Sequence, residues 1–204
     1  MTSPQRVQAL ILATRYIARR RIPGAIVECG VWRGGSMLAT ARTLLHAADT
    51  TRELYLFDTF SGMPEPGPDD VRAHDGAAAS VLLKDPGEER TRAAASLDTV
   101  KATMALCQFD PRRVHYVAGK VEETVPAAAP QAIALLRLDT DWYESTRHEL
   151  EHLFPRLSAG GVLIIDDYGW WAGARRAVDE YFAGHAEPIL LNIIDDTGRI
   201  GVRV

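Results

Sequence analysis

Two runs of mostly aliphatic residues in the second half of the chain each end in aspartates. Residues 132–138 are followed by Asp139, Thr140 and Asp141, and residues 161–165 are followed by Asp166 and Asp167. Each run is short enough for a strand buried on both faces of a parallel sheet. Because parallel strands end at one shared edge, the carboxylates should gather there, where a cation is needed to compensate them. Mg²⁺, which prefers oxygen ligands, is the natural candidate.

The rest of the chain alternates between strand and helix patterns. A helix begins at Ser3 and Pro4 and should stop before Pro23 and Gly24. Asp195 opens a hairpin signal, so the last strand should be antiparallel. This alternation predicts an α/β fold with a seven-stranded, mostly parallel sheet and helices on both faces. Further helices are expected at about 36–47, 91–107, 121–125, 145–153 and 174–183, and strands at 26–29, 54–58, 114–117, 132–138, 161–165, 189–194 and 200–204.

Composition limits the class of protein. A chain of 204 residues with 47% hydrophobic content can form one domain spanning 1–204. The formal net charge of −4 argues against a nucleic-acid partner, and no apolar stretch approaches the roughly 20 residues of a membrane span. Two cysteines, Cys29 and Cys107, are too few for a disulfide framework. With no apolar segment at the start, a cytoplasmic protein without a membrane partner is expected.

Residues 61–89 interrupt the rhythm of strands and helices. They contain four prolines, several glycines and many charges, which are typical of a long loop. Long connections of this kind are usually functional covers or disordered, so we expect a lid over a substrate site. His74, within this segment, is an alternative candidate for a catalytic base.

A glycine-rich turn, residues 28–36, joins the first core strand to a helix. Gly30, Gly34 and Ser36 could let a ligand approach the backbone and the free N–H groups of the helix. The spacing does not reproduce the G-x-G-x-x-G of nicotinamide enzymes. Glu28 instead suits a ligand with an amine, such as the methionine end of S-adenosylmethionine, and Asp58 could accept hydrogen bonds from ribose hydroxyls. The structural alternatives are a buried charge at Glu28 and a turn cap at Asp58.

Residues after other strands are weaker candidates. Gly119 and Glu122 could contact adenine or simply form a turn. Four aromatic residues beyond the acid clusters could line a pocket or belong to the core, namely Trp142, Tyr143, Trp170 and Trp171. A pair of exposed tryptophans and the amphipathic first helix would be compatible with a homodimer.

The acid clusters supply the candidate chemistry. Asp139, Asp166 and Asp167 could hold Mg²⁺ and leave positions for water and a substrate hydroxyl. Asp141 is the preferred general base, with a metal-ligand role nearly as well supported, and Asp139 shares the catalytic assignment. Alternatively, Asp139 or Asp141 could cap the following helix.

Four ordered motifs resemble the macrocin O-methyltransferase family: VECGVWRGGS (27–36), FDTFSGMP (57–64), LDTDWYEST (138–146) and GGVLIIDDYG (160–169). The match extends from about residue 25 to residue 183. The resemblance implies a class I methyltransferase fold of the Rossmann-like type, S-adenosylmethionine as donor, a bound Mg²⁺ and methylation of a sugar hydroxyl on a glycosylated natural product. By matching positions, Asp139, Asp166 and Asp167 would be the metal ligands and a nearby acid would be the base.

Other functions remain open at this point. The chain is shorter than typical members of that family, with little sequence before the first core strand, so a different polyol or a catechol is an alternative small-molecule hydroxyl acceptor. A nicotinamide-dependent oxidoreductase is disfavoured by the glycine spacing. A binding module without chemistry is disfavoured by the intact set of acids.

Overall fold

The computed structural model describes residues 2–87, 89–185 and 189–204. Its sheet has seven strands, as expected, and their order is β3-β2-β1-β4-β5-β7-β6. All neighbours from β3 to β5 pair in parallel, and β7 runs antiparallel to both β5 and β6. The strands are β1 (Ala25–Cys29), β2 (Leu54–Asp58), β3 (Val114–Ala118), β4 (Ile133–Leu138), β5 (Leu157–Ile165), β6 (Asn192–Ile193) and β7 (Arg199–Val202).

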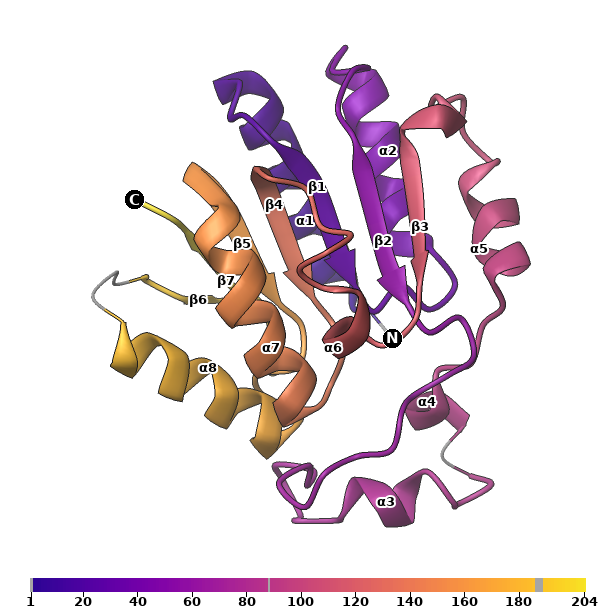
Figure 1. Ribbon diagram of the computed structural model, residues 1–204, viewed down its shortest axis with the longest axis vertical. Helices are drawn as coiled ribbons and strands as arrows, with labels where there is room; N and C mark the ends of the chain where they lie inside the picture. The colour runs from indigo at the N-terminus through magenta and orange to yellow at the C-terminus, as the bar shows by residue number, and fades with distance from the viewer. Residues whose placement is uncertain (1, 88, 186–188) are drawn as a thin grey trace.

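Helices cover both faces of the sheet (Figure 1). On one face, the apolar side chains of α1, α2 and α5 pack on Ile26 of β1 and Leu135 of β4. On the other, those of α6, α7 and α8 pack on Val27 and Leu136, because successive strand residues face opposite sides. The helices are α1 (Pro4–Arg20), α2 (Gly35–His46), α3 (Ala79–Leu82), α4 (Glu89–Arg92), α5 (Leu97–Met104), α6 (Val121–Thr124), α7 (Tyr143–Leu153) and α8 (Ala172–Gly184), with short 3-10 turns η1 (Pro111–Arg113) and η2 (Phe154–Arg156).

Helix α1 begins as its sequence predicts. The Ser3 hydroxyl oxygen accepts a hydrogen bond from the N–H of Arg6 at 3.1 Å, and Pro4 occupies the first turn. The helix ends at Arg20, before the predicted stop at Pro23 and Gly24, because Arg21 adopts a left-handed conformation. Leu10 and Ile17 are buried in the core, so the apolar stripe of this helix is already covered within the chain. It therefore no longer supports the homodimer, which stays a prediction.

Three expectations need correction. The helix expected at 91–107 is divided into α4 and α5, because Ala93 has a positive φ of 43° and the Ser96 hydroxyl caps α5 by accepting from the N–H of Thr99. The segment 61–89 contains helix α3 and an isolated bridge between Val71 and Ala78, so it is more than a loop. Glu88 of that segment lies outside the described residues. The strand expected at 189–194 is reduced to the two residues of β6.

Segment 61–89 lies below the C-terminal edge of the parallel strands (Figure 1). It is attached to the start of α8, where Ala73 N–H donates to Trp170 O at 2.8 Å and Ala172 N–H donates to Val71 O at 2.9 Å. These backbone bonds make it a wall of the space at that edge. In the described part of the chain, no helix is both long and apolar enough to span a bilayer.

The ends of β1 and β4 approach each other closely at Gly30. This glycine has a φ of 82°, and a Cβ added to it would lie 1.9 Å from the carbonyl oxygen of Asp139. Asp139 N–H donates to Cys29 O at 2.8 Å, which holds the two strand ends together. The glycine is therefore required for the position of Asp139.

We expect Gly30→Ala to lower the free energy of unfolding by more than about 2 kcal/mol, because the methyl group and the positive φ together force the strand ends apart. Urea unfolding measures this change. Gly76→Ala is the matched control, since Gly76 also has a positive φ of 72° but open space around its Cα. Equal losses in the two variants would contradict the close-approach explanation.

Candidate active site

The C-terminal edge of the sheet carries a cavity of about 1090 Å³, bounded by the glycine turn, the ends of β2 and β4, and segment 61–89. This volume slightly exceeds the roughly 300 to 1,000 Å³ of most small-molecule sites, which leaves room for two ligands. Eight predicted site residues line it: Gly30, Ser36, Asp58, Gly119, Glu122, Asp139, Asp141 and Asp167.

Three aspartates predicted as metal ligands meet at the ends of β4 and β5. One carboxylate oxygen from each of Asp139, Asp166 and Asp167 lies within 4.8 Å of the others. Asp166 and Asp167 are buried, and Asp139 is half-buried. The parallel pairing of β4 with β5 explains the meeting, because Leu138 and Ile165 are register partners and the aspartates follow them directly.

Arg137, in the middle of the acids, was not among the predicted site residues. Its guanidinium contacts Glu28 Oε1 at 2.7 Å, Asp139 Oδ2 at 2.7 Å and Asp166 Oδ1 at 2.6 Å. The sheet register places Glu28 of β1 directly beside Arg137 of β4. Burial alone would lower the pKa of Arg137, but the three carboxylates outweigh this effect and raise it well above its ordinary value.

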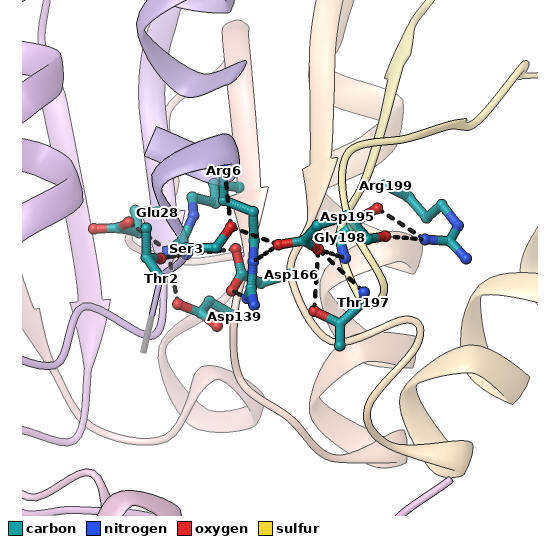
Figure 2. A network of polar contacts seen from close by, with 11 residues as sticks. Thr2, Ser3, Arg6, Glu28, Asp139, Asp166, Asp195, Thr197, Gly198 and Arg199 are labelled. Carbon is teal, nitrogen blue, oxygen red and sulfur yellow. Dashed lines mark hydrogen bonds and ion pairs between the residues drawn. The ribbon is translucent and has the colours of Figure 1, made fainter. Parts of the chain in front are cut away.

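A second arginine reaches the cluster from the first turn of α1 (Figure 2). Arg6 binds the other oxygen of Asp166 through Nη1, and its Nε contacts Asp195 Oδ2 at 2.9 Å. The Ser3 hydroxyl donates to the same Asp195 oxygen at 2.5 Å. Asp195 also accepts from the N–H of Gly198 in the β6–β7 turn, so the first helix and the last hairpin are joined at the acid cluster.

The acids outnumber these two cations. Glu28, Asp139, Asp141, Asp166 and Asp167 lie around Arg137 and Arg6, so negative charge would remain uncompensated if all five acids were ionised. Burial raises the pKa of Asp139 and Asp167 well above the ordinary value and that of Asp141 to about 7. The site is therefore short of positive charge in its fully ionised form.

The donor set fits a small divalent cation. Ligand oxygens about 2.1 Å from Mg²⁺ lie about 3 to 4 Å from each other, and one oxygen of each of the three carboxylates lies within 4.8 Å of the others. Asp166 has both oxygens on arginines, yet each carboxylate oxygen has about two lone-pair directions and can accept a second partner. The same aspartates can therefore bind the arginines and a metal ion at the same time.

Asp141 occupies an unusual backbone position at this edge. It has a φ of 68°, and its carboxyl group lies beside that of Asp167. The alternative that Asp139 or Asp141 caps helix α7 is wrong. The cap position is Trp142, without a side-chain cap bond, and the free N–H of Tyr143 is satisfied by Asp70 Oδ1 at 2.7 Å.

Asp58 has structural partners on both carboxylate oxygens. Oδ2 accepts from the N–H groups of Val31 and Trp32 at 2.7 and 2.9 Å, and Oδ1 accepts from the N–H of Phe60 at 2.7 Å. It therefore holds the glycine turn and also caps its own turn, as the structural alternative proposed. Because it also lines the cavity, ribose binding stays a prediction.

Two predicted cofactor residues face away from the cavity. Glu28 is buried against Arg137 and does not line the cavity, so its partner is a guanidinium where an amine had been expected. Gly34 is also outside the lining, because it faces Val100 of α5, 3.1 Å from the position a Cβ would take. Gly35, its neighbour, lines the cavity in its place.

The aromatic residues have different environments. Trp142 and Trp171 are buried and meet edge to face at 5.0 Å, which is core packing, although Trp171 also lines the cavity. Trp170 is 42% exposed and lines the cavity, so the pair of exposed tryptophans expected for a homodimer is not present. His74 packs near Trp170 but is exposed and absent from the cavity lining, so the structure does not bring this alternative base to the acid cluster.

Sequence signals existed for the residues that were missed. Arg137 stands in a strand expected to be buried on both faces, where a charge requires buried partners, and Glu28 stands likewise in the neighbouring strand. Arg6 and Asp195 carry no such signal, since each belongs to a segment that would be exposed if considered alone. Only the tertiary fold brings them together.

Comparison with known proteins agrees with this geometry. The family model described as macrocin-O-methyltransferase (TylF) matches residues 1–200. The 8-demethyl-8-(2,3-dimethoxy-alpha-L-rhamnosyl)-tetracenomycin-C 4'-O-methyltransferase of Streptomyces olivaceus is 34% identical over 97% of this chain and 73% of its own length. The mycinamicin III 3''-O-methyltransferase of Micromonospora griseorubida is 35% identical over 91% of this chain and 70% of its own.

The structure of the O-methyltransferase NovP superimposes with a TM-score of 0.81 at 31% identity, over 98% of this chain and 79% of that chain. The fold is that of the class I methyltransferases, with the seven-stranded, mostly parallel sheet predicted from the sequence. The chain belongs to the macrocin O-methyltransferase family.

Proposed function

We propose that this protein is an S-adenosylmethionine-dependent, Mg²⁺-dependent O-methyltransferase that acts on a sugar hydroxyl of a glycosylated natural product. The observation that carries the proposal is the meeting of Asp139, Asp166 and Asp167, with Asp141, at a cavity beside the glycine turn. The relatives named for a rhamnosyl tetracenomycin and for mycinamicin III support the class of acceptor.

The donor is assigned to the part of the cavity formed by the glycine turn. Gly30 presents backbone at the end of β1, Gly35 and Ser36 do so at the start of α2, and Gly119 and Glu122 border the same cavity. S-adenosylmethionine supplies a methyl group on a positively charged sulfur, which leaves as a neutral thioether. The excess of carboxylates nearby favours the binding of a cationic donor.

The acceptor is assigned to the part between the acids and segment 61–89, where Met63, Pro64 and Trp170 line the cavity. Asp139, Asp166 and Asp167 would hold Mg²⁺, which lowers the pKa of a coordinated hydroxyl. Asp141 would take the hydroxyl proton as the oxygen forms its bond to the methyl carbon and the carbon–sulfur bond breaks. Segment 61–89 would exclude water from this space as a lid.

We expect methyl transfer from labelled S-adenosylmethionine to a panel of glycosides to be lost in EDTA and restored by Mg²⁺. Asp167→Asn should lower kcat/KM by at least about 100-fold, because a metal ligand is removed. Asp110→Asn is the control, since Asp110 lies at the surface on Arg112. Activity indifferent to chelation would remove the metal from the proposal, and transfer to catechols in preference to glycosides would favour the alternative acceptor.

Asp141→Asn should lower kcat by about 100-fold or more, because an amide cannot accept the hydroxyl proton. Calorimetric titration with Mn²⁺ separates the two roles of this residue. Unchanged metal affinity is expected for a base. A metal affinity that falls together with kcat would instead make Asp141 a ligand.

Arg137→Met should cost about 3 to 5 kcal/mol of stability, because Glu28 is left buried without its cation and Asp166 keeps only Arg6. Urea unfolding measures the loss. The matched control is Arg147→Met, whose partners Glu144 and Glu151 are exposed, and which should cost less than about 1 kcal/mol. Adding Glu28→Gln to Arg137→Met should recover part of the loss, and no recovery would contradict the assigned pairing.

A further inference from the structure

The backbone at Asp141 is strained. Trp142 N–H donates to Thr140 O at 2.8 Å, two residues back, around Asp141 with its φ of 68°. A hydrogen bond of this span around a residue with positive φ defines the rarer and more strained form of γ-turn. Such a conformation costs about 1 to 3 kcal/mol in a residue other than glycine and persists only where its surroundings enforce it. Contacts with neighbouring residues must therefore keep Asp141 in this conformation.

A buried glutamate contacts the turn from the interior of the protein. Glu149, on α7, is fully buried, and its Oε2 accepts a hydrogen bond from the Thr140 hydroxyl at 3.2 Å. Thr140 stands between Asp139 and Asp141, so the contact fixes the residue that precedes the strained position. Ser145, on the same helix, also donates to the backbone oxygen of Trp142 at 3.1 Å.

Packing alone does not account for a glutamate at this position. Its second oxygen, Oε1, is buried and has no hydrogen-bond partner in the described part of the chain, a cost that an apolar residue would avoid. Burial also raises its pKa well above the ordinary value. A neutral glutamic acid can bind the Thr140 hydroxyl without adding another charge to the acid cluster.

We propose that Glu149 is a positioning residue that holds Asp141 in its strained conformation by fixing Thr140 from the protein interior. The inference rests on the proposed function in one respect, which is that Asp141 is the base whose position matters. A merely structural Glu149 would affect stability and leave the geometry of Asp141 and the turnover of the folded enzyme unchanged.

The experiment compares variants of Thr140 with a matched buried threonine. Thr140→Val removes the hydroxyl that Glu149 binds, and we expect kcat to fall about 10- to 100-fold, with the KM for S-adenosylmethionine nearly unchanged, because the base is displaced. Thr140→Ser keeps the hydroxyl and should restore kcat. Glu149→Gln, neutral and of the same shape, should also retain most of kcat.

Thr14→Val is the control. Thr14 is buried on α1, where its hydroxyl binds Leu10 O, so this variant loses a buried hydrogen bond far from the turn. A kcat for Thr140→Val equal to that for Thr14→Val would overturn the proposal, as would a failure of Thr140→Ser to restore activity. If kcat falls as much in Glu149→Gln as in Thr140→Val, the result would contradict the role of Glu149 as a neutral hydrogen-bond partner.

Crystal structures of the wild type and Thr140→Val provide a readout independent of turnover. We expect Asp141 to leave the positive φ region when the hydroxyl is removed. An Asp141 that keeps its conformation in the variant would overturn the positioning role. If the wild type transfers no methyl group, the proposed function fails, and the φ of Asp141 still decides the role of Glu149.

Discussion

The salt bridges of Arg137 to Glu28, Asp139 and Asp166 are the interaction on which the site depends. They join the ends of β1, β4 and β5 through one buried guanidinium. Buried charges are expensive to desolvate, so the arrangement is stable only with every partner in place. The same contacts fix the carboxylates at the sheet edge before any ligand binds. Stability of the fold and geometry of the site therefore share one set of side chains.

The fold was largely predictable because the strands are short, apolar and regularly separated by helical patterns. The antiparallel β7 was predicted from the turn at Asp195, whereas the order of the strands was not predicted. The division between α4 and α5 was not predicted, because the positive φ of Ala93 has no signature in an alanine-rich segment. Likewise, α3 is a single helical turn in a proline-rich segment, too short for periodicity to reveal.

Prediction of the site was good for residues at strand ends and poor for their partners. The position of Asp139, Asp166 and Asp167 follows from the sheet alone, since parallel strands end at a common edge. The pairing of Glu28 with Arg137 needs the register of β1 against β4, which no single segment contains. The contact of Arg6 with Asp166 depends on how α1 crosses the sheet. Ion pairs between residues distant in the sequence are therefore the part of the site that cannot be predicted without the three-dimensional fold.

The ion pairs of Arg6 connect the first helix directly to the acid cluster of the candidate active site. One side chain in the first turn of α1 touches Asp166 in the acid cluster and Asp195 in the last hairpin (Figure 2). A version of the chain shortened to begin after residue 6 would lack Arg6. Asp166 would then lose one of its counter-ions, although no strand would be altered.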